Sequence, residues 1–305
     1  MKEKPEFIGR HYEDEEKSKL ERVLYSWSGK ELQPVEGELE KTGEDIKIIK
    51  ATNALIGNEL RSLGIENYQP ISLEKIHILP DEIFEKKFPD FGGVAFFSST
   101  SDVVYVNKDR IDTKARFFST LLHELIHRAS TRKFYADKGG GVYDARVGFR
   151  VRSPWKGSNK EDRLLGFNEL MDDCTVYKIF IENQDSLKEL GISKTDIQGA
   201  VFSYTNYSPI LESIIKKVAN NKNISPAKVF EDFERGQFEN SILVLKDVEK
   251  AFGKGALDIL SLLGTLKNQE DNNQLEELIK QFFAEEDNSR RLEIQQRIRQ
   301  LIQEL

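Results

Sequence analysis

The chain has 305 residues, with 45 Lys and Arg against 52 Asp and Glu, and it carries only four histidines and one cysteine. This length, with 38% hydrophobic residues, allows a sizeable core in one large domain or two average ones. The net charge of -7 argues against non-specific nucleic-acid binding, which needs a basic surface. A single cysteine excludes an intramolecular disulfide and every structural zinc site built from several thiolates. Any metal site must therefore use mainly histidine and carboxylate.

The sequence carries no signal for secretion or membrane insertion. Its first thirty residues lack a long apolar segment followed by a small-residue cleavage site, so we expect no signal peptide. No run of eighteen apolar residues occurs, so we expect no membrane span. The default location for such a chain is the cytoplasm.

The first hundred residues combine a charged segment, a helix and strands. Residues 1–42 are charge-dense and weakly periodic, which predicts a loosely packed N-terminal arm. The apolar spacing predicts a helix over residues 45–63. Strand signals follow at residues 75–79 and in two β-rich runs, 94–97 and 103–106, around a polar turn. These two runs predict a hairpin that precedes a second helix.

Residues 113–131 predict an amphipathic helix that begins after Asp112, a residue type favoured at N-caps. At about 100° per residue, its apolar side chains fall on one broad arc and several polar ones fall nearly opposite. The apolar arc comprises Phe117, Phe118, Leu121, Leu122, Leu125 and Ile126, and the polar side comprises Arg116, Thr120, His123 and His127. The helix is thus expected to have an apolar back and a polar front.

The segment after this helix, residues 132–163, is predicted to be rich in loops, with one alternating run over 143–152 that is typical of a strand. Arg146, Arg150 and Arg152 belong to the polar side of this run. We interpret them as a solvated strand face, with a preference for acidic substrates as the alternative.

The remainder of the chain has the apolar periodicity of helices. Helices are predicted over residues 162–182 and 208–219, and the pattern is wholly helical from residue 220 onward. The further predicted helices lie at residues 226–234, 241–252, 256–266 and 275–283 and in the C-terminal tail. The tail repeats its apolar residues over too few positions to indicate a coiled coil, so we expect a helical hairpin packed on the body of the protein.

Two histidines stand four residues apart on the polar front of the helix at residues 113–131. In the sequence His123-Glu124-Leu125-Ile126-His127, side chains at i and i+4 project to the same side, so both imidazoles can reach one zinc ion. Glu124 then lies beside the metal, where a carboxylate can take a proton from zinc-bound water and pass it to a leaving amine. The alternative, a chance placement on a buried helix, is rare in a chain with four histidines.

A catalytic zinc site needs a third protein ligand. The residues after His127 lack the glycine and histidine of the metzincin extension, and Cys174 lies downstream, whereas a deformylase-like site has its cysteine upstream. The remaining histidines, His11 and His77, fall in the predicted arm and in a predicted strand. A carboxylate is therefore the expected third ligand.

The predicted helix at residues 162–182 supplies such carboxylates. Glu169 and Asp173 are spaced i and i+4 on one face of a helix otherwise rich in Leu, Phe, Met and Ile. Carboxylates are costly to bury in such a helix unless they bind a metal or accept strong hydrogen bonds. The alternative is a helix end exposed to solvent.

The two motifs together, HELIH and then NELMDD, resemble the gluzincin metallopeptidases, the thermolysin-like group with HExxH followed by NExxxD. The resemblance covers about eighty residues and implies that His123, His127 and Glu169 are zinc ligands and that Glu124 is the general base. It also implies that Asp173 supports a zinc-binding histidine, with Asn168 beside it and Asp172 as the alternative if the register differs. A carboxylate in that place fixes the histidine tautomer and raises its basicity.

The chain departs from this group at the oxyanion-stabilising residue. Thermolysin itself uses a downstream histidine, and no histidine follows His127. The role needs a hydrogen-bond donor aimed at the developing charge, which a tyrosine can supply. The candidates are Tyr207 and Tyr204, with Tyr143 behind them, and the alternative for each is a half-buried core aromatic.

These observations combine into an α+β fold with a zincin-like core, a small and mostly antiparallel sheet and the HExxH helix, followed by an all-helical region. The expected segments are an arm at residues 1–42, a catalytic domain at 43–222 and a helical region at 223–305. Zincins commonly bind an extended peptide along a strand, and residues 94–97 or 103–106 are the candidates.

The expected function is zinc-dependent hydrolysis of peptide bonds in a peptide or protein substrate, with Zn²⁺ as the cofactor. The alternatives are a non-catalytic zincin fold that binds peptides or acts as a scaffold, and a self-regulating protease. In the latter, residues 1–42 or 223–305 would cover the cleft. The sequence leaves the oligomeric state open.

Overall fold

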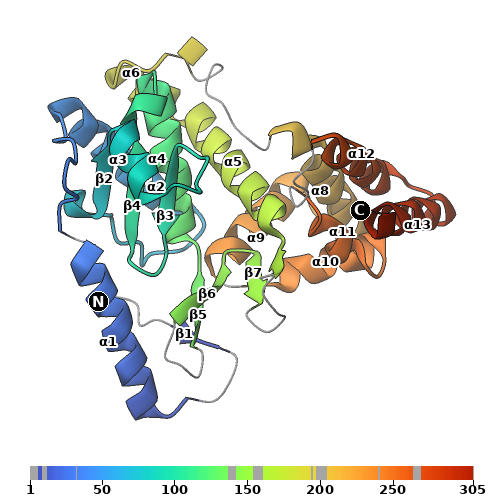
Figure 1. Ribbon diagram of the computed structural model, residues 1–305. Coiled ribbons are helices and arrows are strands. Elements are labelled where there is room, and N and C mark those ends of the chain that lie inside the picture. The colour runs from blue at the N-terminus through green and yellow to red at the C-terminus, as the bar shows by residue number, and fades with distance from the viewer. Residues whose placement is uncertain are drawn as a thin grey trace. The chain divides into compact units, whose positions relative to one another are not determined.

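The computed structural model of the chain describes residues 6–8, 12–31, 33–136, 142–153, 161–193, 195–196, 205–239, 241–263 and 269–304. These residues form a mixed α and β structure in which helices predominate and the strands make small mixed sheets (Figure 1). The predicted α+β class is confirmed at this level. Among the described helices, none is both long and apolar enough to cross a bilayer.

The chain divides into two compact units, each made from two stretches of sequence. Unit 1 contains residues 1–147 and 175–201, and unit 2 contains residues 148–174 and 202–305. One of the changes from one unit to the other falls inside helix α5 (Leu165–Glu182). The two units are therefore interleaved in the sequence, because helix α5 contributes to both.

A three-stranded sheet in unit 1 has the order β2-β4-β3, with β2 at Ile76–Leu79, β3 at Ala95–Ser98 and β4 at Val103–Asn107. β3 and β4 pair antiparallel, as the predicted hairpin requires. β2 pairs parallel with β4, so the sheet is mixed rather than mostly antiparallel. After β2, the connection through helix α3 (Asp81–Lys87) leads to β3 at the opposite edge of the sheet. The β3–β4 hairpin then places β4 in the centre, between β3 and β2. All five residues of β4 are buried, as a central strand requires.

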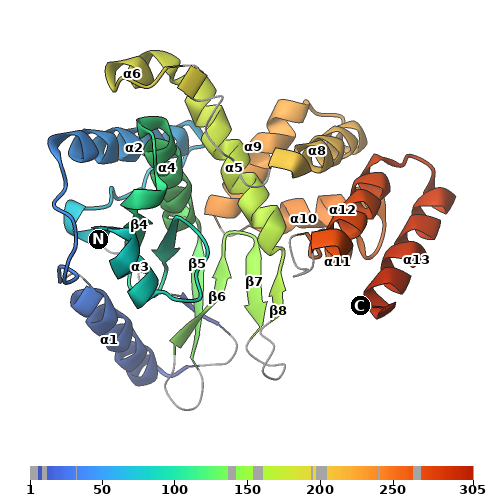
Figure 2. The same ribbon diagram turned by 45° about the horizontal axis from the view of Figure 1, so that its top comes forward.

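Helices α2 (Gly43–Ser62) and α4 (Lys114–Ala129) pack against each other in unit 1 (Figures 1 and 2). α2 begins with a capping box, in which the side chains of Thr42 and Asp45 each accept the other's backbone N–H. These two hydrogen bonds fix the N-terminus of α2 at Thr42.

The N-terminus of α4 lies one residue later than predicted. The side chain of Thr113 accepts the backbone N–H of Arg116 at 3.1 Å, so Thr113 is the N-cap and Asp112 is not. The six residues of the predicted apolar arc are all buried, which confirms the orientation expected for this helix.

Part of the predicted N-terminal arm is packed rather than loose. β1 (Glu6–Phe7) pairs parallel with β5 (Arg132–Ala136), and β5 pairs antiparallel with β6 (Val142–Val147). Helix α1 (Asp14–Glu31) follows β1 in the chain. Buried residues of this segment and of the two strands form one cluster, made of Tyr12, Leu20, Leu24, Phe134, Ala136 and Val142.

The alternating run over residues 143–152 predicts one strand, but the structure divides it into two strands. β6 ends at Val147, and β7 (Arg150–Ser153) begins after a turn. In that turn Gly148 has a φ of +55°, which glycine adopts without the steric penalty of a side chain, and Phe149 is fully buried. Alternation alone does not reveal this turn, because the apolar and polar order continues through it. In unit 2, β7 pairs antiparallel with β8 (Glu161–Arg163).

Unit 2 is built from helices around one apolar core. Besides the first half of α5, its described helices are α8 (Ser208–Lys222), α9 (Pro226–Phe238), α10 (Leu243–Phe252), α11 (Ala256–Leu260), α12 (Gln269–Ala284) and α13 (Asn288–Glu304). α12 and α13 lie side by side in both views, and α12 packs on α8 (Figure 2). The predicted C-terminal helical hairpin is therefore confirmed. The short elements of the chain are η1 (Leu73–Lys75), η2 (Lys108–Arg110), α6 (Gln184–Glu189) and η3 (Thr205–Tyr207).

Candidate metal centre

Helix α4 presents two histidines on the side opposite its buried arc. The rings of His123 and His127 lie 4.7 Å apart between centroids, with their planes inclined at 85°. Both histidines are partly exposed, whereas Glu124 beside them is only 7% exposed. The helix thus offers two accessible imidazoles with a largely buried carboxylate next to them in the sequence.

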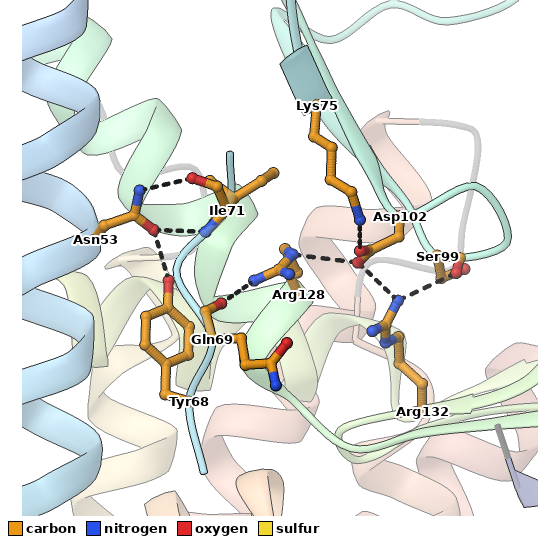
Figure 3. A network of polar contacts seen from close by, with 9 residues as sticks. All are labelled: Asn53, Tyr68, Gln69, Ile71, Lys75, Ser99, Asp102, Arg128 and Arg132. Atoms are coloured by element: carbon orange, nitrogen blue, oxygen red, sulfur yellow. Dashed lines mark hydrogen bonds and ion pairs between the residues drawn. The ribbon is translucent and has the colours of Figure 1, made fainter. Parts of the chain in front are cut away.

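The C-terminal end of α4 is fastened to the β3–β4 hairpin by Asp102 (Figure 3). Arg128, which follows His127, donates from Nε to Asp102 Oδ1 at 3.1 Å, and Arg132 donates from Nη1 to the same oxygen at 3.2 Å. Lys75, directly before β2, donates to the other oxygen. Burial alone would raise the pKa of Asp102, but the charges of the two arginines and the bond from Lys75 hold this pKa below its ordinary value. One ionised carboxylate therefore joins three cations from separate elements.

A second group of contacts holds the loop before β2 (Figure 3). The Asn53 side chain on α2 donates to the carbonyl of Ile71 at 3.1 Å and accepts the N–H of Ile71 at 2.9 Å. The same oxygen of Asn53 accepts the hydroxyl of Tyr68 at 2.9 Å, and burial raises the pKa of Tyr68 to about 12, so this hydroxyl keeps its proton. Arg128 donates from Nη1 to the carbonyl of Gln69 at 2.6 Å. The helix that carries the histidines is thereby tied to the loop that follows α2.

The carboxylates of the second motif lie in the first half of α5. Glu169 is partly exposed, whereas Asp172 is 0% exposed and Asp173 is 4% exposed. The second half of the same helix belongs to unit 1, where the ring of Phe180 packs 5.1 Å from the ring of Phe118 on α4. An unbroken helix thus leads from a contact with α4 back to the carboxylates.

Asp172 is held by two side-chain amides within unit 2. Asn168 donates from Nδ2 to Asp172 Oδ2 at 2.8 Å, and Gln237 on α9 donates from Nε2 to Asp172 Oδ1. Asn168 is itself oriented, because its Oδ1 accepts the backbone N–H of Phe149 at 2.8 Å. Both oxygens of Asp172 therefore act as acceptors, as those of an ionised carboxylate do.

Four described side chains form a group with the composition of a metal site. His123, His127, Glu169 and Asp172 each offer one ligand atom, and these atoms all lie within 4.8 Å of one another. Two imidazoles and two carboxylates suit zinc and other divalent transition metals. Glu124 is outside this group.

The fourth member of the group differs from the residue that the family resemblance implied. The resemblance put Asp173 beside a zinc-binding histidine and kept Asp172 as the alternative. The group includes Asp172 and leaves out Asp173, although both are buried. On a helix, positions three and four residues after Glu169 lie on the same face, so sequence spacing alone cannot choose between them.

Other potential ligands are engaged elsewhere or unsuited to the role. His77 is 1% exposed in β2, where its Nδ1 lies 2.8 Å from Glu38 Oε2 and its ring stacks on Tyr105. Burial, and after it the negative charge of Asp173, raises the pKa of the Cys174 thiol to about 12. The thiolate needed to bind a metal is therefore scarce at neutral pH. His11 lies outside the described residues.

Of the three tyrosines predicted to stabilise the oxyanion, the structure describes the side chain of Tyr207 only. Tyr207 is 5% exposed in the core of unit 2 and donates its hydroxyl to Glu276 on α12. Because a phenol has a single O–H, this bond uses the donor that the oxyanion role requires. Tyr204 lies outside the described residues, as does the side chain of Tyr143. The structure therefore identifies no oxyanion donor among these candidates.

The three arginines predicted as a positive strand face do not share one environment. Arg146 on β6 is 8% exposed. Arg150 and Arg152 both bind Asp162, with Arg150 Nη2 at 2.8 Å and Arg152 Nε at 3.1 Å from its carboxylate. Their charge is thus partly neutralised within the β7–β8 hairpin.

Gln237 is not among the site residues predicted from the sequence, although a signal for it exists. Gln237 is 0% exposed and lies four residues after Phe233 and eight after Val229, both buried, on the apolar side of α9. A polar side chain on the apolar arc of a helix requires a buried partner. That partner cannot be named from the sequence, because Asp172 is 65 residues away.

Comparison with known proteins gives no relative from which a role for this group could be transferred. No protein-family model, no curated protein and no solved structure matches the chain.

Proposed function

We propose that the chain is a zinc-dependent metallopeptidase in which His123, His127 and Glu169 hold the metal and Glu124 is the general base. The observation that carries this proposal is the group of four ligand atoms within 4.8 Å of one another, three of which belong to these residues. Two histidines and one glutamate form a frequent ligand set of catalytic zinc and leave a coordination position open. A zinc ion bound there would polarise a carbonyl oxygen and lower the pKa of a bound water.

Glu124, which directly follows His123 in the sequence, is the proposed general base of this hydrolysis. In the reaction, the oxygen of water bonds to the carbonyl carbon of the peptide, and the bond from that carbon to nitrogen breaks. Glu124 takes the proton that the water loses and delivers it to the leaving nitrogen. Its 7% exposure supports this role, because a carboxylate shielded from bulk water exchanges protons with the site rather than with solvent.

Strand β3 is the element best suited to hold a peptide substrate. Of the two strands that the sequence offered for this role, β4 is central, with β2 and β3 on its two sides, whereas β3 is at the edge of this sheet. β3 also packs on α4, which carries the two histidines. An edge strand binds an extended peptide through backbone hydrogen bonds, which places few demands on the side chains of the substrate.

The first test is metal content. Mass spectrometry of protein purified without added zinc should find about one zinc per chain. His123→Ala should lose that zinc, because it removes one of the proposed ligands. A wild-type protein without bound metal would refute the proposed function.

The second test separates metal binding from catalysis. Glu124→Gln should keep zinc and lose cleavage of a peptide library by at least about a hundredfold, since general base catalysis contributes about 10²–10⁴. The matched control is Glu59→Gln, which changes a carboxylate of the same 7% exposure on α2 and should leave turnover intact. Full activity of Glu124→Gln would contradict its role. Retention of peptides without cleavage by the wild type would instead favour the alternative, a non-catalytic peptide-binding module.

A further inference from the structure

We propose that Gln237, on helix α9, is a positioning residue of the metal centre, which acts by holding the Asp172 carboxylate from the side opposite Asn168. The proposal rests on the proposed function, because it assigns a role within the same site. It also gives the helical region at residues 223–305 a part in the centre.

The burial of Asp172 makes its hydrogen-bond partners important. The residue is 0% exposed, and a carboxylate without water must find donors within the protein. Asn168 Nδ2 donates to one oxygen of Asp172, and Gln237 Nε2 donates to the other oxygen. Two donors from opposite ends fix the plane of the carboxylate, so the remaining lone pairs point in set directions.

The two donors are themselves held in place. Asn168 has its amide oriented by the N–H of Phe149 in the turn after β6. The ring of Phe233, one turn before Gln237, lies 5.9 Å from the ring of Phe167 on α5 and 6.2 Å from that of Phe149. α9 therefore cannot rotate Gln237 away from Asp172 without disrupting this aromatic packing.

The choice of glutamine at this position also needs a reason beyond packing. The side chain is 0% exposed on the apolar side of α9, where a leucine or methionine would fill the space without burying an amide. Neutral amides orient a carboxylate but do not neutralise its charge, so an Asp172 held in this way is compatible with a divalent cation beside it. The group of His123, His127, Glu169 and Asp172 is a place where such a cation binds under the proposed function.

The test compares two glutamine-to-methionine variants. Gln237→Met keeps the length of the side chain and removes the donor to Asp172. The matched control is Gln295→Met on α13, where a glutamine 7% exposed donates to the carbonyl of Lys254 at 3.4 Å, within the same unit. Zinc affinity is measured by competition with a chromophoric chelator, and the ligand geometry by the visible spectrum of the protein loaded with Co²⁺.

The expected result is a 10- to 100-fold loss of zinc affinity in Gln237→Met, the usual effect of removing a hydrogen bond that supports a metal site from outside its ligands, with an altered Co²⁺ spectrum. Gln295→Met should keep the wild-type affinity and spectrum. Unchanged affinity and spectrum in Gln237→Met would overturn the proposal, even with a lowered melting temperature, because a purely structural glutamine affects only the latter.

A second variant keeps the proposal falsifiable if Gln237→Met does not fold. Asn168→Asp retains an oxygen for the N–H of Phe149 and removes the donor to Asp172, so it should weaken zinc binding at least tenfold. Wild-type affinity in this variant would count against the positioning of Asp172 by amides. If the wild type itself binds neither Zn²⁺ nor Co²⁺, the proposed function fails and this inference fails with it. If the wild type binds zinc and the variants bind it with the same affinity, this inference fails but the proposed function does not.

Discussion

Gly148 shows how one residue without a side chain allows the carboxylate support to form. Its φ of +55° lies in the left-handed region, and a Cβ there would meet Gln237 Cγ at 3.1 Å and would overlap with Asn168 Oδ1. Both neighbours are the side chains that hold Asp172. Glycine is therefore needed here for the backbone conformation and for the space.

The residue-scale prediction concerns Gly148→Ala. The backbone term should cost about 1–2 kcal/mol, and the clash with Asn168 should add to this loss and weaken zinc binding. Gly64→Ala is the matched control, because Gly64 also has a positive φ of +79°, but a Cβ there would meet nothing within 4 Å beyond its neighbours in the chain. Urea unfolding and zinc competition should show both losses in Gly148→Ala and only the backbone cost in Gly64→Ala. Equal behaviour of the two variants would exclude a special role for the space beside Gly148.

At the scale of elements, Asp102 is the junction between α4, the start of β2, the β3–β4 hairpin and β5. It has a positive φ of 57°, a conformation that Asp and Asn tolerate better than most residues. Its position in the hairpin turn lets its side chain meet cations that are distant in sequence. The placement of strand β3 along α4 depends on this junction.

Asp102→Asn should lower the free energy of unfolding by about 1.5–3 kcal/mol at pH 7, because it removes the charge that three cations share while keeping the backbone conformation. The folded-state pKa of Asp102 is lowered, so its contribution is present above the unfolded-state pKa of about 3.9 and is lost as the pH falls through the folded-state value. The difference between wild type and variant should therefore persist from pH 7 to pH 5 and shrink below about pH 4. Urea unfolding across this pH range measures it.

The control for this prediction is Asp185→Asn. Asp185 also pairs with a lysine, but its side chain is 96% exposed, so its replacement should leave stability unchanged at every pH. A difference for Asp102→Asn that is independent of pH would show that the charge of Asp102 is not what stabilises the junction.

The elements near the HExxH motif were predictable because each follows from local sequence. The hairpin at 95–107 and the apolar back of α4 depend on alternation and on the helical repeat, and both are confirmed. The parallel pairing of β2 with β4 depends on a connection through α3 and on no local pattern. The N-cap was misplaced by one residue because Asp112 and Thr113 are both suitable types, and only the hydrogen bond to Arg116 distinguishes them.

In the candidate site, too, contacts set by the helical repeat could be predicted from the sequence, and contacts between distant residues could not. His123 and His127 are paired by the helical repeat alone, so the sequence suffices to place them together. The choice of Asp172 over Asp173 depends on the packing around α5, and the contact with Gln237 spans 65 residues. The bond from Tyr207 to Glu276 spans 69 residues, and nothing in the sequence around Tyr207 indicates it.

At the scale of the whole molecule, the core of unit 2 draws on two separate stretches of sequence. Phe149, Phe167, Leu170 and Met171 are fully buried in the same cluster as the helices from α8 onward. A fragment of residues 223–305 would lack these side chains as well as α8. It would thus leave a large part of its apolar surface exposed to water.

We expect this fragment, expressed alone, to show no cooperative thermal unfolding, although it should retain some helical signal in circular dichroism. The physical reason is that removal of buried aromatic and aliphatic side chains costs about 2–5 kcal/mol each, which exceeds the stability of a small domain when several are absent. Calorimetry of the fragment and of the full chain provides the measurement. A sharp transition in the fragment would mean that residues 223–305 form a domain without help from residues 148–174.

The interleaved sequence of the two units also determines when the centre can be completed during synthesis. Glu169 and Asp172 leave the ribosome before residues 175–201, whereas Gln237 and most of the core around them follow later. Until α9 has been made, Asp172 lacks the donor that Gln237 supplies, and the first half of α5 has no complete core to pack against. Under the proposed function, the order of translation would therefore reserve full metal affinity for the finished chain, and a nascent or truncated product without α9 would bind zinc more weakly.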